Sequence, residues 1–387
     1  MLVKSFIVIL FFGLAAASSG VFAAEFKGEE LTALGQSYAQ AINDLDADAF
    51  SALISNPHLA QEIADFAGDS ASEKLELFRA FEEAMPGISK RMLKELERQG
   101  SRAVFLRVHE FDGMRGPLVR YSVGDGYNYV LLLPVRPADA GSSALIGDMY
   151  YATGGELLSE TMGIATKLVV SPSETFLGKL FGVNEVDQDL VSRFGKIGQL
   201  RQQNKLKEAF EVLDQIPGGA RNHRVILMNT IQIASQLDEG LYREELRRLA
   251  KYHGDDPRAA FTLLDHYFFE NDLDGAMSII DLMEESYGSD AVLYLFRANV
   301  ELARSRIDAA LGFADSAVQL EPGNEEAQWT RLTILVEAEM FGESVGVLQL
   351  LESEFGYLFA REDFEADPLY AEFVRSEEFA QWMDAPH

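Results

Sequence analysis

A short segment that recurs along the second half of the chain constrains the fold most strongly. Each copy is a polar turn followed by a small residue at the start of a helical stretch. Clear copies begin at Asn204, Asn271 and Ser305, and a weaker one begins at Met340. A period of about 34 to 38 residues is typical of stacked helical hairpins, in which a small residue lets two helices approach closely. The pattern therefore predicts an all-α solenoid over residues 183–363.

These segments resemble the tetratricopeptide repeat. The resemblance is clearest at Ala276, Ala310, Ala317 and Pro322, and it is weakest at Val345, where a small residue is expected. Four units are expected, over residues 190–220, 258–289, 290–322 and 323–356, with a divergent pair of helices over 222–257. Residues 364–387 are expected to form a capping helix, because an open solenoid end would expose an apolar face.

The first half of the chain has a different pattern. Residues 29–99 have helical periodicity, with a helix start expected at Asp46 and a break or kink at Pro86. After Gly100 the period becomes that of strands, which are expected over residues 103–111, 118–123, 127–135 and 144–151. Asp112-Gly113 and Asp125-Gly126 are typical of tight hairpin turns. The sequence thus predicts an α+β domain, in which a four-stranded antiparallel meander lays one face on the helices.

This first half also resembles a known family. Helices followed by a four-stranded meander look like the nuclear transport factor 2 (NTF2) and cystatin-like folds. The phrases over residues 126–129 (GYNY) and 148–160 (DMYYATGGELLSE) resemble secreted bacterial proteins that carry such a domain ahead of helical repeats. The resemblance implies an NTF2/cystatin-like domain with its linker over residues 24–182. It also implies a cone between the concave face of the sheet and the helices.

Polar residues on the expected strands form a candidate pocket in that cone. These residues are Arg107, His109, Arg120, Tyr129, Asp148 and Tyr150. A His with an Asp can transfer protons in a dry cavity, and a Tyr with an Asp can stabilise an enolate. The alternative is that these side chains lie on the solvated face of an antiparallel sheet. We therefore assign no catalytic residue and expect no cofactor.

Metal binding is not expected either. The chain has no cysteine, which removes thiolate metal sites and disulfides. Two clusters of acidic residues partly match the spacing of a calcium-binding loop. One consists of Asp44, Asp46 and Asp48, and the other lies between Glu270 and Asp281. The second coincides with the turn of a repeat, and a carboxylate-rich turn is usually only solvated.

The N-terminus has the form of a secretory signal peptide over residues 1–23. A single positive charge at Lys4 precedes an apolar run of about a dozen residues, which is short for a membrane span of about 20 residues. Small residues before Ala24 suit a cleavage site. We expect a periplasmic or secreted protein with no stable membrane insertion after cleavage.

The charge of the chain is strongly negative and unevenly distributed. There are 62 Asp and Glu residues against 33 Lys and Arg, a formal charge of -29, so nucleic acid is not expected as a partner. Residues 259–387 contain 27 of the acidic and only 6 of the basic residues. Acidic groups on the concave side of the repeats would engage a basic peptide or protein. The proposed surface consists of Glu325, Glu326, Glu337 and Glu339. The alternative is that the charge only serves solubility.

Together these patterns predict a non-enzymatic, periplasmic scaffold that binds proteins through its repeats. The alternative prediction is that the N-terminal cone binds or transforms a small apolar ligand while the repeats recruit partners.

Overall fold

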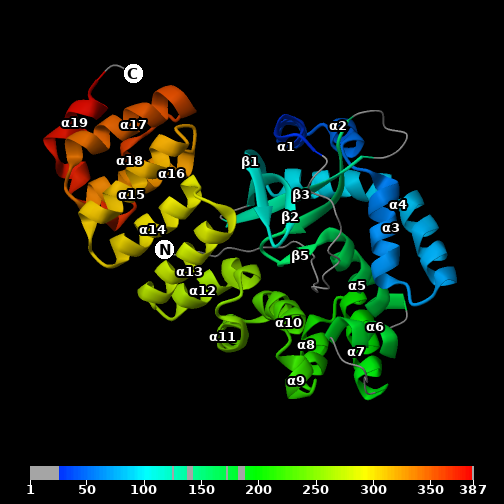
Figure 1. The fold of residues 1–387 in the computed structure, drawn as a ribbon. Helices are drawn as coiled ribbons and strands as arrows, with labels where there is room; N and C mark the ends of the chain where they lie inside the picture. The colour runs from blue at the N-terminus through cyan, green and yellow to red at the C-terminus, as the bar shows by residue number, and fades with distance from the viewer. Residues whose placement is uncertain (1–25, 124–125, 137–142, 171–172, 182–187, 386–387) are drawn as a thin grey trace. The chain divides into compact units, whose positions relative to one another are not determined.

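The computed structural model describes residues 26–123, 126–136, 143–170, 173–181 and 188–385 (Figure 1). The chain forms two compact units, the first up to His266 and the second from Tyr267 onward. The signal peptide expected at residues 1–23 lies outside the described residues. Within the described ranges, no helix is both long enough and apolar enough to cross a membrane.

Four helices open the first unit: α1 (Gly28–Asn43), α2 (Ala47–Ala52), α3 (Asn56–Ala67) and α4 (Ala71–Arg98). The helix start expected at Asp46 is confirmed, because its carboxylate accepts hydrogen bonds from the backbone N–H groups of Asp48 and Ala49. Of the break or kink expected at Pro86, a break does not occur, because α4 continues through this residue. Pro86 is exposed, so water can satisfy the backbone carbonyl that loses its helical partner there.

An antiparallel sheet follows. Its strands are β1 (Arg102–Phe111), β2 (Met114–Val123), β3 (Gly126–Val135), β4 (Leu145–Tyr151) and β5 (Glu156–Leu157), in the order β1-β2-β3-β4-β5. The meander is confirmed, but the short β5 makes it five-stranded instead of four-stranded. The turn at Asp112 and Gly113 has the positive φ values, 51° and 75°, that this dipeptide predicts. Asp125, in the second expected turn, lies outside the described residues.

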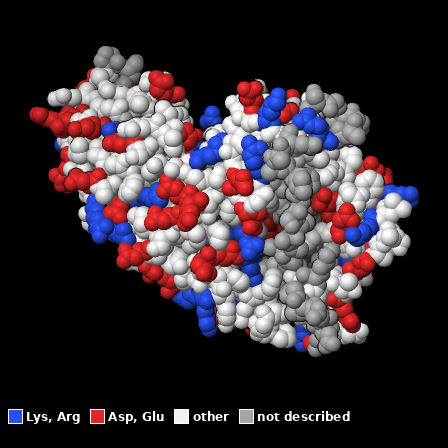
Figure 2. All heavy atoms as spheres, viewed as in Figure 1, with Lys and Arg blue, Asp and Glu red and all other residues white. Residues whose placement is uncertain are grey.

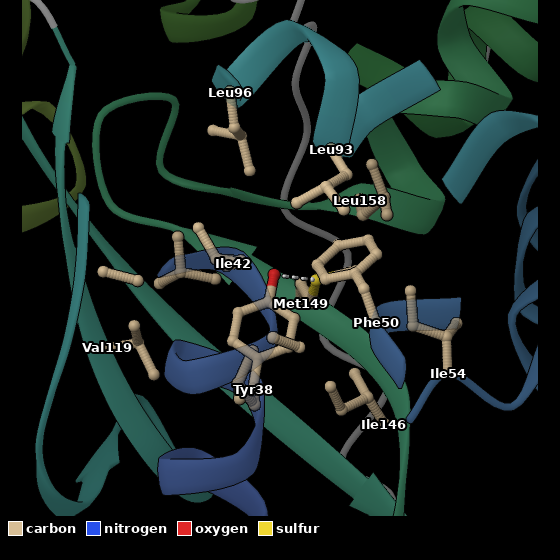
Figure 3. Packing of buried hydrophobic residues seen from close by; sticks show 14 of the residues in the cluster. Tyr38, Ile42, Phe50, Ile54, Leu93, Leu96, Val119, Ile146, Met149 and Leu158 are labelled. Atoms are coloured by element: carbon tan, nitrogen blue, oxygen red, sulfur yellow. Dashed lines mark hydrogen bonds between the residues drawn. The ribbon is translucent and has the colours of Figure 1, made fainter. Parts of the chain in front are cut away.

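One face of the sheet packs on the helices, as the pattern predicted. Helix α1 contacts β1 and β2, and α3 contacts β4. Figure 3 shows the centre of this core, where Tyr38 of α1 and Phe50 of α2 lie beside Met149 of β4. Val119 and Ile146 contribute from the strands, and all five side chains are essentially inaccessible to water. Burying a side chain of this size stabilises the fold by about 1.5 to 3 kcal/mol.

The rest of the chain is helical. The helices are α5 (Leu158–Val170), α6 (Glu174–Phe181), α7 (Gln188–Gln202), α8 (Leu206–Asp214), α9 (Gly218–Arg221), α10 (Arg224–Leu237), α11 (Glu239–His253), the 3-10 helix η1 (Pro257–Ala259), α12 (Ala260–Phe269), α13 (Leu273–Tyr287), α14 (Ala291–Ala303), α15 (Ile307–Leu320), α16 (Glu325–Glu337) and α17 (Phe341–Phe355). From α7 onward they form successive helical hairpins.

The turns of these hairpins confirm the repeat. Asn204, Asn271, Ser305 and Glu339 each have a φ between 53° and 56°, in the left-handed region. Ser305 lies 34 residues after Asn271, and Glu339 lies 34 residues after Ser305. The hairpin of α10 and α11, which turns at Asp238, fills the longer gap after Asn204. The predicted divergent pair over 222–257 is therefore one more hairpin of the same array.

The small residue after each turn is buried, as expected. Ala209, Ala276 and Ala310 have no exposed surface. In the last hairpin the sequence comparison placed Val345 at this position, but the structure places Ser344 there, 34 residues after Ala310 and equally buried. A serine is small enough for the close approach, so the apparent mismatch was an error of one residue in the alignment.

The C-terminal segment covers the last hairpin as predicted, but not as one helix. It forms α18 (Arg361–Glu365), η2 (Pro368–Tyr370), η3 (Phe373–Arg375) and α19 (Glu377–Met383). Pro368 cannot extend the preceding helix, and Asp367 and Ser376 start new ones by capping them. Phe364, Phe379 and Trp382 are buried with the apolar residues of α16 and α17.

Candidate functional site

The residues predicted to line a pocket lie on the other face of the sheet. Arg120 pairs with Tyr129 across β2 and β3, and Leu131 beside them pairs with Tyr150. Register and alternation put Arg107 and His109 on the same side as these residues, which we call the outer face. The six residues thus lie on one face of the sheet. However, their face points away from α1, α2 and the core around Tyr38.

The inner face, where the cone was expected, is filled by side chains. The Tyr38 hydroxyl donates to the sulfur of Met149 at 3.3 Å and accepts from the hydroxyl of Tyr121 (Figure 3). The Tyr151 hydroxyl also points to this sulfur, at 3.7 Å. Burial raises the pKa of all three tyrosines, so they remain neutral. Among the described residues, this face carries a hydrogen-bonded polar cluster within a core of buried apolar side chains.

Asp148 has a structural partner at the start of α5. It lies on β4, whereas His109 lies on β1, with β2 and β3 between them in the strand order. The carboxylate of Asp148 instead accepts hydrogen bonds from the backbone N–H and the hydroxyl of Ser159, at 3.1 and 2.5 Å, at the start of α5. Burial raises the pKa of Asp148 to about 7. Its geometry is that of a cap at the start of α5.

The turn between β4 and β5, together with Glu156 at the start of β5, is held by contacts from β3 and α10. The Asn128 side chain accepts a hydrogen bond from the backbone N–H of Thr153 at 3.1 Å. Arg224, at the start of α10, donates to the backbone carbonyl of Gly154 at 2.9 Å. The same guanidinium lies 3.7 Å from the carboxylate of Glu156 and 3.5 Å from that of Asp256. We call residues 152–156 the docked turn.

The beginning of α12 completes this contact. The ring of Phe261 meets the ring of Tyr129 edge to face, with centroids 5.0 Å apart. The hydroxyl of Thr262 donates to the backbone carbonyl of Thr153 at 3.5 Å. Gly155 has a φ of +69°, and a Cβ added there would lie 2.5 Å from the carbonyl oxygen of Arg258. The starts of α10 and α12 are therefore packed on the outer face and the docked turn.

Glu156 is the most deeply buried of the ionisable residues that form the ion pairs of this contact. Only 2% of its surface is exposed, and its Oε1 atom has no hydrogen-bond partner among the described residues. Thr161 donates to the other carboxylate oxygen at 3.4 Å. Burial raises the pKa of Glu156 to about 8, although Arg224 opposes the shift. A buried acid of this kind is retained at a cost to stability, which is a reason to look for a function.

Sequence reasoning did not assign a role to these residues. The phrase containing Gly154, Gly155 and Glu156 was noted only for its resemblance, and Arg224 and Arg258 were not singled out. A signal was nevertheless present, because Arg258 follows Arg224 by 34 residues, the period of the repeat.

The second unit carries the predicted acidic surface. Residues 267–387 contain 26 Asp and Glu residues and six arginines, without any lysine. All six arginines form ion pairs with carboxylates of the same unit: Arg297, Arg304, Arg306, Arg331, Arg361 and Arg375. Two of these pairs repeat with the hairpins, Arg297 with Asp281 at 2.8 Å and Arg331 with Asp315 at 2.6 Å. In Figure 2 the surface over α14 to α19 shows far more acidic than basic side chains.

The four predicted carboxylates are exposed but do not form one compact patch. Glu325 and Glu326 lie in the first turn of α16, and Glu325 accepts a hydrogen bond from the hydroxyl of Tyr357. Glu337 ends the helix and Glu339 follows in the turn. Twelve residues of helix separate the two pairs by about 18 Å. The surface is thus two acidic pairs at opposite ends of one helix.

The carboxylates considered for calcium have other roles. Asp46 caps α2, and Asp272 caps α13 by accepting from the backbone N–H of Gly275. Asp281 pairs with Arg297. Among the described residues, no group of three or more metal-ligating side chains is arranged to hold an ion. An enclosed cavity lined by Ile164 and Asn229 measures only about 10 Å³, enough for one water molecule.

Comparisons with known proteins found likenesses among solved structures. No family model and no curated protein matches the chain. Among solved structures, the chain is similar to YrrB, described as a TPR protein with an unusual peptide-binding site. The identity is 15%, the match covers 46% of this chain and 89% of YrrB, and the TM-score is 0.31. The peptide-binding site is a property of YrrB.

Proposed function

We propose that the chain is a protein-interaction scaffold whose second unit binds a basic segment of a partner protein. The observation that carries this proposal is the charge of residues 267–387, where every arginine is already paired inside the unit. A cationic partner would meet carboxylates such as Glu326 and Glu337 without competition from a nearby lysine. The field of such a surface also speeds the encounter with a basic partner.

The two acidic pairs define the spacing of that partner. An extended peptide rises about 3.3 Å per residue, so about five or six residues span the 18 Å between the ends of α16. Basic residues at that spacing would reach Glu325 and Glu326 with one side chain, and Glu337 and Glu339 with the other. Trp329, half-buried between the two pairs, adds an aromatic surface.

The remaining predictions belong to the same proposal. Residues 1–23 would direct the protein to the periplasm or the exterior, and the α+β part of the first unit would be an NTF2/cystatin-like domain without catalytic activity. The buried apolar side chains around Tyr38 on the inner face support a structural role for that part.

A labelled peptide tests the proposal. Its ten residues carry lysines at positions 2 and 8 among Ser and Ala, and a second peptide carries Glu at those positions. We expect the full chain to bind the lysine peptide by fluorescence anisotropy, with weaker binding as NaCl is raised from 50 to 300 mM. Reversing Glu325, Glu326, Glu337 and Glu339 to Lys should weaken binding at least tenfold.

A matched variant separates a local site from net charge. Glu76, Glu82, Glu83 and Glu97 are exposed on α4 and can be reversed to Lys with the same change in charge. We expect this control to bind the lysine peptide nearly as well as the wild type. Equal loss of binding in both variants would show that only net charge matters, and would refute the site.

A further inference from the structure

Two arginines at equivalent repeat positions hold one short segment of the chain. Arg224 and Arg258 are 34 residues apart, one period of the repeat, with Arg224 at the first residue of α10 and Arg258 in η1, directly before α12. Arg224 binds the carbonyl of Gly154 and faces the carboxylate of Glu156. The backbone of Arg258 lies against Gly155. Between them, the carboxylate of Asp256 lies 3.1 Å from the guanidinium of Arg258 and 3.5 Å from that of Arg224, which fixes both.

The contact selects a particular chemistry in the segment it holds. The position of Gly155 excludes any side chain, because a Cβ would overlap the Arg258 carbonyl and because φ is positive. The following residue must bring a carboxylate toward Arg224, and the preceding carbonyl of Thr153 must accept from Thr262. A protein surface recognises a peptide by features of this kind: main-chain hydrogen bonds, a position that accepts only a small residue, and an acidic side chain.

We propose that the face of α10, η1 and α12 carrying Arg224, Arg258 and Phe261 is a peptide-binding surface, and that its ligand is a turn of two small residues followed by an acidic residue. The chain fills this surface with its own docked turn, residues 152–156. The inference is separate from the basic partner of the second unit, since this surface is cationic. At the same repeat position, the next two hairpins carry Val292 and Glu326.

Occupation in cis explains why an outside peptide would be excluded. A segment tethered within the same chain has an effective concentration in the millimolar range or above, so a micromolar peptide cannot compete. Weakening the internal turn while leaving the helices intact should open the surface. Gly155→Val does this, because its side chain clashes with Arg258 and cannot adopt the positive φ without strain.

The test uses a labelled peptide that copies residues 150–159 of this chain, YYATGGELLS. We expect no measurable binding to the wild-type full chain at about 10 μM protein. This concentration is well below the effective concentration of the docked turn in the same chain. Gly155→Val should bind it, and adding Arg224→Ala should weaken that binding at least tenfold. A peptide with Gln in place of its Glu should also bind Gly155→Val more weakly.

Folding is checked by far-UV circular dichroism, and Gly155→Ala, which adds the same Cβ with less bulk, replaces Gly155→Val if the latter does not fold. Absence of binding to a folded Gly155 variant would overturn the proposal. Binding that is unchanged by Arg224→Ala would overturn it as well, because the peptide would then be held elsewhere.

Discussion

The ion pair between Arg221 of α9 and Glu245 of α11 tests how the first unit tolerates buried charge. Their side chains are 2% and 3% exposed, and Nη2 lies 2.5 Å from Oε1. Nevertheless, Nε and Nη1 of Arg221 and Oε2 of Glu245 have no hydrogen-bond partner among the described residues. The pair therefore recovers only part of the cost of removing both groups from water.

The magnitudes follow from that geometry. Glu245→Leu alone leaves a buried guanidinium, and it should destabilise the first unit by about 3 to 5 kcal/mol. Asp214, 3.9 Å from Arg221 and 59% exposed, can compensate only weakly. Adding Arg221→Met removes the remaining charge and the unsatisfied atoms together. The double variant should therefore regain wild-type stability or exceed it by about 1 to 4 kcal/mol.

The two units can be measured separately. Both tryptophans, Trp329 and Trp382, lie in the second unit, so their fluorescence reports on that unit while far-UV circular dichroism reports on both. In urea, Glu245→Leu should lower the midpoint of the circular dichroism transition of the first unit by roughly 1 to 2 M, and the fluorescence transition should not move. A double variant that is as unstable as the single one would refute the reasoning, because the pair would then be a net source of stability.

Three further predictions concern single side chains. Glu339→Gly should stabilise the second unit by up to about 1 kcal/mol, because Glu339 has a φ of 56°, whereas Glu337→Gly, at the last residue of α16, should destabilise it by up to about 1 kcal/mol; fluorescence-detected unfolding compares the two, and effects of the same sign would contradict the backbone argument. The pKa of Glu156 in the folded state, about 8, is above its ordinary value of 4.5, so the folded state binds the proton more tightly and stability should fall as the pH rises from about 4.5 to about 8. Glu156→Gln should flatten this dependence in thermal unfolding, and an unchanged slope would assign it to other groups. Tyr38→Phe removes the acceptor of the buried Tyr121 hydroxyl and should lower the free energy of unfolding in urea by about 1 to 3 kcal/mol. A decrease below about 0.5 kcal/mol, the size of a neutral change, would mean that this hydroxyl has another partner.

The elements of this protein were predictable because their signals are local. The helix start at Asp46, the turn at Asp112 and Gly113, and the repeated turns at Asn271 and Ser305 each depend on a few neighbouring residues. The repeat period even placed the divergent hairpin of α10 and α11. Errors remained where a local rule depends on the surroundings, as at Pro86, which an exposed helix face tolerates.

The candidate site was predictable only in part. Alternation along the strands correctly put Tyr129 and Tyr150 on one face, but it could not say which face the helices would cover. That choice depends on the fit of the apolar residues around Tyr38 and Met149, which come from distant parts of the sequence.

The sequence by itself determined the two periodicities, the repeat of 34 residues and the strongly acidic last third. The tertiary structure alone decided that the chain divides after His266, that the first repeats pack on the outer face of the sheet, and that Arg224 and Arg258 meet the docked turn. Periodicity reflects interactions between residues that are close in the sequence, so the pattern can be recognised in the sequence itself. A contact between Gly155 and Arg258 depends on the summed geometry of about a hundred intervening residues, and no local pattern encodes it.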